Sequence, residues 1–389
     1  MILLYTFLFI FSVFLLSKKD SNFNNSLSPS LLLLVMMFLY STFGGLFILN
    51  KTDVSSIYIN YWLIQFLCLL GVIFSIIFNN FNLSKQIKRD TPNFKIKLFF
   101  IIIVSIHFLL YVSKYGGINA IFSNGYRLVF ESDDTNLLNF SILGLLATFS
   151  LKFNMHRLIF CSSLLFFFIA ILLGTRGIAV SFLSLPIMSF YLDNKRFSYN
   201  KIIYFVPIII FFLIVAYVRN IGFSNIKVLM SLDSDFYYSL FIENSEFNTS
   251  GLVFYTGYMN PNWYENNFFE YIYGIIAAII PKGLWPTRPE SISNIFSLKF
   301  APPGEGIGFS IGYESFVIFG FFGPLLYFYL LQFFIQKLYC SNKFYINCFV
   351  LFCPLLIMWI NRIDVQTIFK VSLIYILYCY MWKFIIKLV

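Results

Sequence analysis

The chain has 389 residues, of which 59% are hydrophobic and only 11% are charged. A soluble domain carries about 25% charged residues, so this composition excludes an ordinary soluble protein and indicates a membrane protein. The formal net charge of +10 would suit a nucleic-acid partner, but the positions of the basic residues favour a different explanation.

Taken in chain order, the apolar segments predict an all-α polytopic membrane protein. A helix needs about 20 mostly apolar residues to cross the hydrocarbon core, so the count is about 11 transmembrane helices, in a range of about 10–12. The segments are Ile2–Leu16, Leu31–Leu49, Ile57–Phe78, Leu98–Val112, Leu137–Leu151, Leu158–Leu173, Ile178–Leu192, Ile202–Val218, Ile311–Phe334, Phe344–Ile360 and Val365–Trp382. The first lacks a basic n-region and a cleavage site, which favours a retained helix over a secretory signal.

The basic residues follow the alternation of the connecting loops. Loops on one side are short and rich in Lys and Arg, with Asp20, Asp90 and Asp193 as their acids. This is the positive-inside pattern. It predicts a multi-pass membrane protein with the N-terminus outside and the C-terminus in the cytoplasm, and it accounts for the net charge without nucleic acid. The basic residues on that side are Lys18, Lys19, Lys85, Lys88, Arg89, Lys95, Lys97, Lys152, Arg157, Lys195, Arg196, Lys201, Lys337, Lys343, Lys383 and Lys387.

Three regions follow from this map. Residues 1–218 form an N-terminal bundle of about eight helices with a small external loop, 113–136; residues 219–310 form one large external loop; and residues 311–389 add about three helices. Within the large loop, the apolar run Phe268–Ile280 is too short to span, which predicts a re-entrant or interfacial helix. The prolines and glycines that follow predict a loop that folds back over the bundle and caps a cavity.

The inventory of ligating residues predicts no metal and no cofactor. The only histidines are His107 and His156, and no cysteine lies in an external loop. A histidine-based metal or acid–base site in the large loop is therefore excluded. No Walker motif occurs, so ATP is not expected as the energy source.

Five cations are candidates for an anionic ligand outside the membrane: Arg176, Arg219, Arg288, Arg127 and Lys282. Each alone is more often structural; Arg176, for example, reads equally well as a snorkelling residue in a tight hairpin. Together they would surround one external cavity, where the planar guanidinium fork matches phosphate bidentately.

Glu314 is the candidate general base. It lies at the start of the predicted ninth span, where a carboxylate is also stabilised by the helix dipole or by a nearby arginine. A base would need a pKa raised by burial against that dipole. The aromatic residues of the large loop, Trp263 and Tyr271 among them, fit either an interfacial belt or a platform for sugar rings.

Four motifs in this order resemble the bacterial O-antigen and capsule repeat-unit polymerases. They are Gly116-Gly117 followed by Arg127, the hairpin Gly174-Thr175-Arg176-Gly177, the segment from Ile280-Pro281-Lys282 to Arg288-Pro289, and Gly306-x-Gly308-Phe309-Ser310-x-Gly312-x-Glu314 with Phe319-Gly320-x-x-Gly323.

The resemblance implies a metal-independent glycosyltransferase of the bacterial inner membrane, with its N-terminus in the periplasm and its C-terminus in the cytoplasm. It would join polyprenyl-diphosphate-linked oligosaccharides on the periplasmic face, with a flippase and a chain-length regulator as partners. The resemblance also implies Arg176, Arg219 and Arg288 on the diphosphate, weaker roles for Arg127 and Lys282, and Glu314 as the base. The alternatives are an O-antigen ligase, which would carry a histidine in the large loop, and a lipid-linked oligosaccharide flippase, which would show an internal repeat and midplane charges.

Overall fold

The computed structural model describes residues 1–19, 29–51, 55–79, 88–117, 135–173, 176–192, 248–265, 268–278, 280, 285–301, 308–339, 341, 343–360 and 363–388. Within these ranges the chain is helical, and its one extended pairing is an isolated bridge between Asp90 and Phe153. The helices of the bundle are α1 (Ile2–Lys19), α2 (Pro29–Lys51), α3 (Ser55–Phe78), α4 (Phe94–Lys114), α6 (Thr135–Lys152), α7 (His156–Leu172), α8 (Arg176–Leu192), α14 (Ile311–Phe319), α15 (Phe322–Tyr339), α16 (Phe344–Trp359) and α17 (Val365–Leu388).

Five of these helices, α1, α2, α3, α4 and α17, are long and apolar enough to cross a membrane. Helices α6, α7, α8 and α16 are apolar but shorter, at 16–18 residues. An all-α membrane protein is therefore supported, whereas the expected total of about 11 spans stays a prediction. The predicted span Ile202–Val218 lies outside the described residues.

One predicted span is broken in two. The apolar run from Ile311 to Phe334 forms α14 and α15, separated at Gly320, which adopts a φ of 63°. That backbone conformation suits glycine and is strained for other residues, so the helix ends there. Helix α15 then packs back on α14: a Cβ at Gly323 would come within 1.9 Å of the Ser315 carbonyl oxygen. The prediction of a single helix over this run was wrong.

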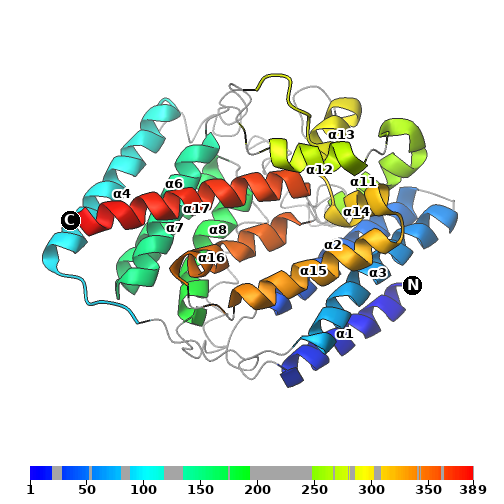
Figure 1. Ribbon diagram of the computed structural model, residues 1–389, viewed down its shortest axis with the longest axis horizontal. Helices are drawn as coiled ribbons and strands as arrows, with labels where there is room; N and C mark the ends of the chain where they lie inside the picture. The colour runs from blue at the N-terminus through cyan, green and yellow to red at the C-terminus, as the bar shows by residue number, and fades with distance from the viewer. Residues whose placement is uncertain are drawn as a thin grey trace, which may run out of the picture.

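Many of the described basic residues gather at one end of the bundle, which we call the basic end. Lys19 bonds the carbonyl of Ile77 at the end of α3, and Arg89 bonds Ser189 Oγ near the end of α8 at 3.0 Å. Lys152 lies close enough to Lys383 and Lys387 to interact with them electrostatically. Helices α15 and α17 both run toward this side, where the C-terminus lies (Figure 1).

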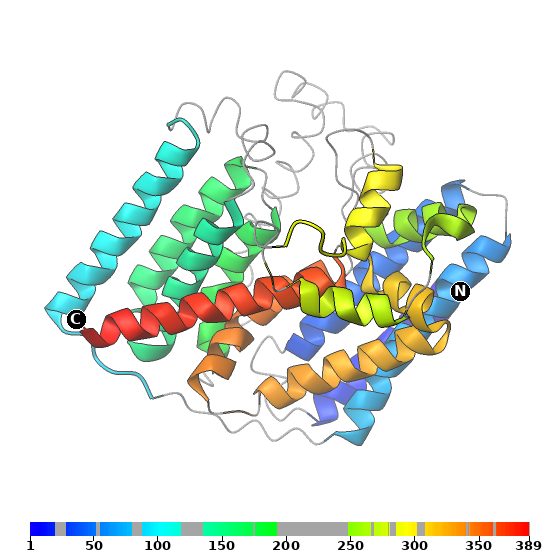
Figure 2. The ribbon, with the colours of Figure 1, turned by 45° about the horizontal axis from the view of Figure 1, so that its top comes forward.

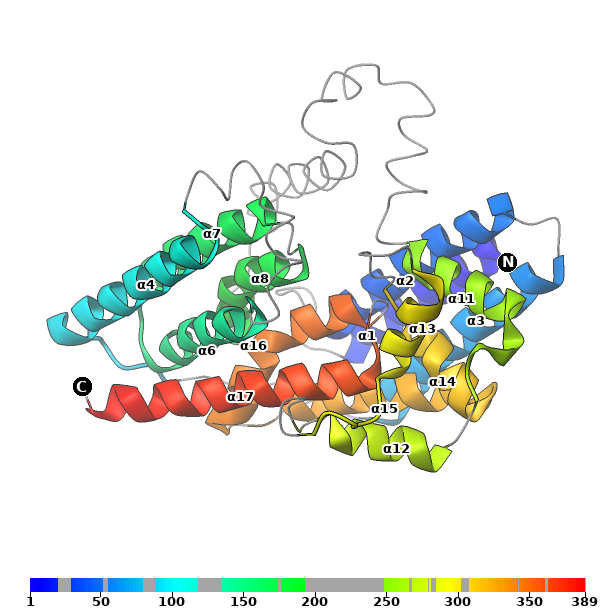
Figure 3. The ribbon, with the colours of Figure 1, turned by 90° about the horizontal axis from the view of Figure 1, so that it is seen from above.

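The opposite end is covered by the described part of the large polar segment, residues 248–301, which we call the cap. It contains α11 (Thr249–Met259), the 3-10 turn η6 (Pro261–Trp263), α12 (Phe268–Ala277) and α13 (Ile292–Phe300). These elements gather around α14, away from the C-terminal end of α17 (Figures 1 and 3). The predicted short helix over Phe268–Ile280 is therefore present, as α12.

The cap is docked on the bundle through a close approach of two helices. A Cβ at Gly251 of α11 would come within 2.3 Å of the Gly44 carbonyl oxygen in α2, so only glycine lets the backbones approach so closely. Beside this contact, Ser250 Oγ donates to the Tyr40 carbonyl at 2.8 Å and lies 3.0 Å from the Tyr61 hydroxyl of α3. The cap is thus anchored to α2 and α3 by buried hydrogen bonds.

Candidate functional site

Glu314 lies where α12, α14 and α17 meet, and its side chain has no solvent exposure. Its Oε1 accepts a hydrogen bond of 2.6 Å from the Tyr271 hydroxyl of α12, and its Oε2 accepts one of 3.1 Å from the backbone N–H of Val365. Figure 2 shows α12 beside the first turns of α17. The carboxyl group therefore joins the cap to the beginning of the last helix.

A second carboxylate, Asp364, is equally buried next to it. Its Oδ1 accepts from the Thr367 N–H at 2.8 Å, which caps the N-terminus of α17. Its Oδ2 accepts from both the hydroxyl and the N–H of Ser293 in α13, at 2.7 and 3.1 Å. Three N–H groups and two hydroxyls thus satisfy the two carboxyl groups at one helix N-terminus, where negative charge is favoured.

Burial has the largest effect on the pKa of Glu314. Helix α14 has nine residues and a length of about 14 Å, so it is too short to cross a membrane. Burial raises the pKa of Glu314 well above its ordinary value and the charge of Asp364 raises it further, while the bonds from Tyr271 and Val365 act in the opposite direction. A raised pKa is what the general-base hypothesis requires.

The Tyr271 hydroxyl continues the network outward. It lies 3.0 Å from the hydroxyl of Tyr327 in α15, which is only partly buried. The same burial, followed by the charge of Glu314, raises the pKa of Tyr271, so this hydroxyl stays protonated as a donor. A chain of two hydroxyls therefore links the buried carboxyl group to the protein exterior.

Of the candidate cations, Arg288 has a defined role. Its Nη1 donates to the carbonyl oxygens of Ala278 and Ile280, at 3.2 and 2.6 Å. These carbonyls follow the last turn of α12, where backbone acceptors lack helical partners. One nitrogen atom of Arg288 thus supplies hydrogen bonds to two carbonyl groups at the end of α12.

The side chains of the other four predicted cations lie outside the part of the chain that the structure describes. Arg176 is the first residue of α8, and its side chain is not described. Arg127, Arg219 and Lys282 lie outside the described residues. A cluster of five cations around one cavity therefore stays a prediction.

The cap aromatics divide into buried and exposed groups. Trp263 is 4% exposed and packs edge-on against Phe296, with ring centroids 4.9 Å apart. It also donates from Nε1 to the Tyr313 hydroxyl at 3.4 Å, and burial raises the pKa of Tyr313 to about 12. Tyr273 of α12 is 49% exposed. Trp263 is therefore a structural centre of the cap rather than an open stacking platform.

Helix α12 carries an apolar face that the described residues leave uncovered. Phe269 is 81% exposed and Ile276 is 60% exposed, while Tyr271, Gly274 and Ala277 are buried on the other face. A helix with one exposed apolar face and one packed face is typical of an interfacial position at a membrane. This agrees with the sequence-based expectation for this segment.

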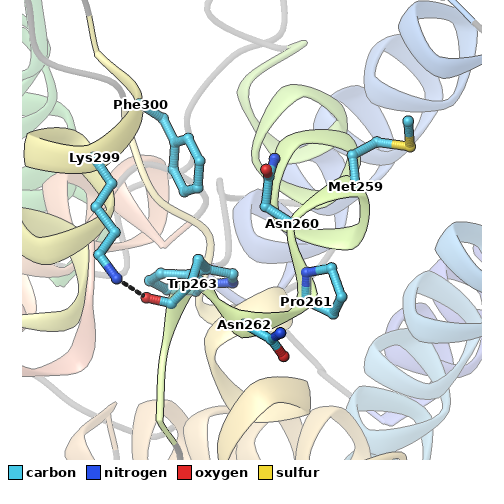
Figure 4. A pocket seen from close by; sticks show the side chains of 7 residues that line it. All are labelled: Met259, Asn260, Pro261, Asn262, Trp263, Lys299 and Phe300. Atoms are coloured by element: carbon cyan, nitrogen blue, oxygen red, sulfur yellow. Dashed lines mark hydrogen bonds between the residues drawn. The ribbon is translucent and has the colours of Figure 1, made fainter.

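An open hollow of about 390 Å³ lies between the end of α11 and the end of α13, lined by residues 259–263 and 299–300. The side chains of Asn260, Phe300 and Lys299 line its rim in Figure 4. Lys299 Nζ donates to the Trp263 carbonyl oxygen at 2.6 Å. The sequence reasoning did not single out Asn260, Asn262 or Lys299; the Asn-Pro-Asn-Trp run at 260–263 was the available signal, because such a run favours a tight polar turn.

Among the described residues, no group of three or more His, Cys, Asp or Glu side chains could hold a metal ion. Comparisons with protein-family models, with curated proteins and with solved structures found no match to this chain.

Proposed function

We propose that the chain is a glycosyltransferase that joins polyprenyl-diphosphate-linked oligosaccharide repeat units into O-antigen or capsular polysaccharide at the periplasmic face of the inner membrane. The observation that carries this proposal is the folded cap, residues 248–301. It covers the end of the bundle away from the basic end and holds the buried carboxyl group of Glu314 through Tyr271.

The reaction needs no external energy source, because the donor is already activated. The hydroxyl of the acceptor sugar attacks the anomeric carbon of the donor glycan, a new C–O bond forms, and the C–O bond to the polyprenyl diphosphate breaks. The electron pair leaves with the diphosphate, where preorganised cations stabilise the developing charge. Arg176, Arg219 and Arg288 are proposed for that role, with weaker contributions from Arg127 and Lys282.

Glu314 would accept the proton of the attacking hydroxyl. Tyr271 stands against the buried carboxyl group. An acceptor therefore reaches Glu314 only when α12 moves aside, or its proton passes through the Tyr271 hydroxyl. The chain of hydroxyls from Glu314 through Tyr271 to the partly buried Tyr327 supports the second route.

A deletion strain tests the function. We expect loss of the polysaccharide ladder on a gel, with single repeat units still transferred to lipid A, and restoration by the wild-type gene. Glu314→Gln and Arg176→Ala should not restore the ladder, while Leu298→Ala, a change at a side chain 75% exposed, should restore it.

Other outcomes identify the alternatives. Lipid-linked repeat units retained on the cytoplasmic leaflet would indicate a flippase, and long lipid-linked chains with no transfer to lipid A would indicate a ligase. Normal ladders from both variants would remove Glu314 and Arg176 from the site.

A further inference from the structure

We propose that the hollow lined by residues 259–263 and 299–300 binds one sugar unit of an anionic glycan, with a carboxylate of that sugar against Lys299. The inference rests on the proposed function and adds to it a substrate class and a binding subsite.

The size and lining of the hollow suit a saccharide. Its volume of about 390 Å³ falls in the range of small-ligand sites, about 300–1,000 Å³. Two side-chain amides, Asn260 and Asn262, border it. The Nδ2 of Asn260 donates to the Thr256 carbonyl at 2.8 Å, which fixes this amide and leaves its oxygen as an acceptor. Amides that both donate and accept match the neighbouring hydroxyls of a sugar ring.

The apolar part of the lining suits the C–H face of a sugar. The ring of Phe300 is partly exposed, and Pro261 is exposed on the opposite wall. Between them lies the nearly buried Trp263, which supports the floor of the hollow by packing on Phe296 and bonding the Tyr313 hydroxyl. A preorganised floor lowers the entropic cost of binding a small ligand.

Lys299 gives the hollow its charge. Among the described residues that line the hollow, it is the only charged one. Its bond to the Trp263 carbonyl holds the ammonium group in place and uses one of the three donors of that group. A carboxylate on the sugar would bind the ammonium group through charge-assisted hydrogen bonds.

The position of the hollow relates it to Glu314. Tyr313, which bonds the floor residue Trp263, directly precedes Glu314 on α14. Tyr264, which follows Trp263, interacts electrostatically with Glu314. The hollow is therefore connected to Glu314 through residues that adjoin its floor, as expected for a subsite that positions a repeat unit.

Binding can be measured without any polymerisation. The full-length protein in nanodiscs is titrated with a tetrasaccharide of alternating glucuronate and N-acetylglucosamine, and separately with the neutral tetrasaccharide of N-acetylglucosamine, by saturation-transfer NMR. We expect the acidic probe to bind about three-fold more tightly, the range of a solvent-exposed ion pair. Lys299→Gln should abolish this preference and Lys299→Arg should keep it. Asn262→Ala should weaken the binding of both probes. Leu298→Ala should match the wild type.

Equal affinity of the wild type for the two probes, or an unchanged preference in Lys299→Gln, would overturn the proposal, and so would the absence of binding. These results are separable from the proposed function. If the probes bind as expected but the deletion strain still makes a normal ladder, the polymerase function is rejected and the sugar site is retained. If the ladder is lost on deletion but no probe binds, only the sugar site is rejected.

Discussion

Replacement of Glu314 and Asp364 by their amides should change the free energy of unfolding by different amounts, because the two carboxyl groups face different sets of partners. A glutamine at 314 can turn its oxygen to the Val365 N–H and its NH₂ to the Tyr271 oxygen, since that hydroxyl can donate to Tyr327 instead. Every group then keeps a partner.

The amide of Asp364→Asn cannot satisfy all the partners of Asp364. Oδ1 accepts from the Thr367 N–H and Oδ2 accepts from the Ser293 N–H, so the new NH₂ must face a backbone donor on one side. One buried N–H then loses its partner at a cost of about 1–3 kcal/mol. We expect Glu314→Gln to change the free energy of unfolding by less than about 1 kcal/mol, and Asp364→Asn to reduce it by about 1–3 kcal/mol.

Thermal unfolding of the purified variants, followed by size-exclusion chromatography after heating, measures this difference. Glu314→Ala is the reference for a disrupted site: it leaves the Val365 N–H unpaired and opens a cavity, for an expected loss of about 2–5 kcal/mol. If Glu314→Gln were as destabilised as Glu314→Ala, the assignment of partners would be wrong. A stable Glu314→Gln also gives a folded protein in which loss of polymer reports on the chemistry of the carboxyl group.

Three further predictions address the cap and the broken helix. Arg288→Ala should remove the charged hydrogen bonds at the end of α12 at about 1.5–3 kcal/mol; hydrogen exchange should rise in α12, and unchanged protection there would contradict the capping role. Gly251→Leu should separate α11 from α2, because a Cβ would contact the Gly44 backbone; the expected loss is at least about 1–3 kcal/mol, and a melting temperature equal to wild type would be inconsistent with the docking. Gly320→Ala meets no neighbouring atom but holds a φ of 63°, so a purely conformational loss of about 1–3 kcal/mol is expected, and a neutral result would argue against the bend.

The sequence predicted helices well where apolar runs are long. The runs Leu31–Leu49, Ile57–Phe78 and Val365–Trp382 fall within α2, α3 and α17, because hydrophobicity alone determines such segments in a membrane. The run Ile311–Phe334 misled the prediction, since hydropathy does not register the positive φ of one glycine, Gly320.

The site was predictable in part. Glu314 stood out as an acid at the edge of an apolar segment, but its partners Tyr271 and Val365 lie 43 and 51 residues away in the sequence. Such contacts depend on tertiary packing. Arg288 was interpreted as an anion contact, which stays a prediction; the structure shows its Nη1 bonded to two carbonyl oxygens. Lys299 gave no signal, because a single lysine in the last turn of a helix is common.

The central claim is that the cap faces away from the cytoplasm and the basic end faces it. Single cysteines at Asn262 and Ser341, in a background with Cys161 and Cys340 replaced by serine, test it with a membrane-impermeant maleimide on intact spheroplasts. The account predicts labelling of the Asn262→Cys protein from outside, and labelling of Ser341→Cys only after permeabilisation. Labelling of Asn262→Cys only after permeabilisation would place the cap in the cytoplasm and contradict the proposed function.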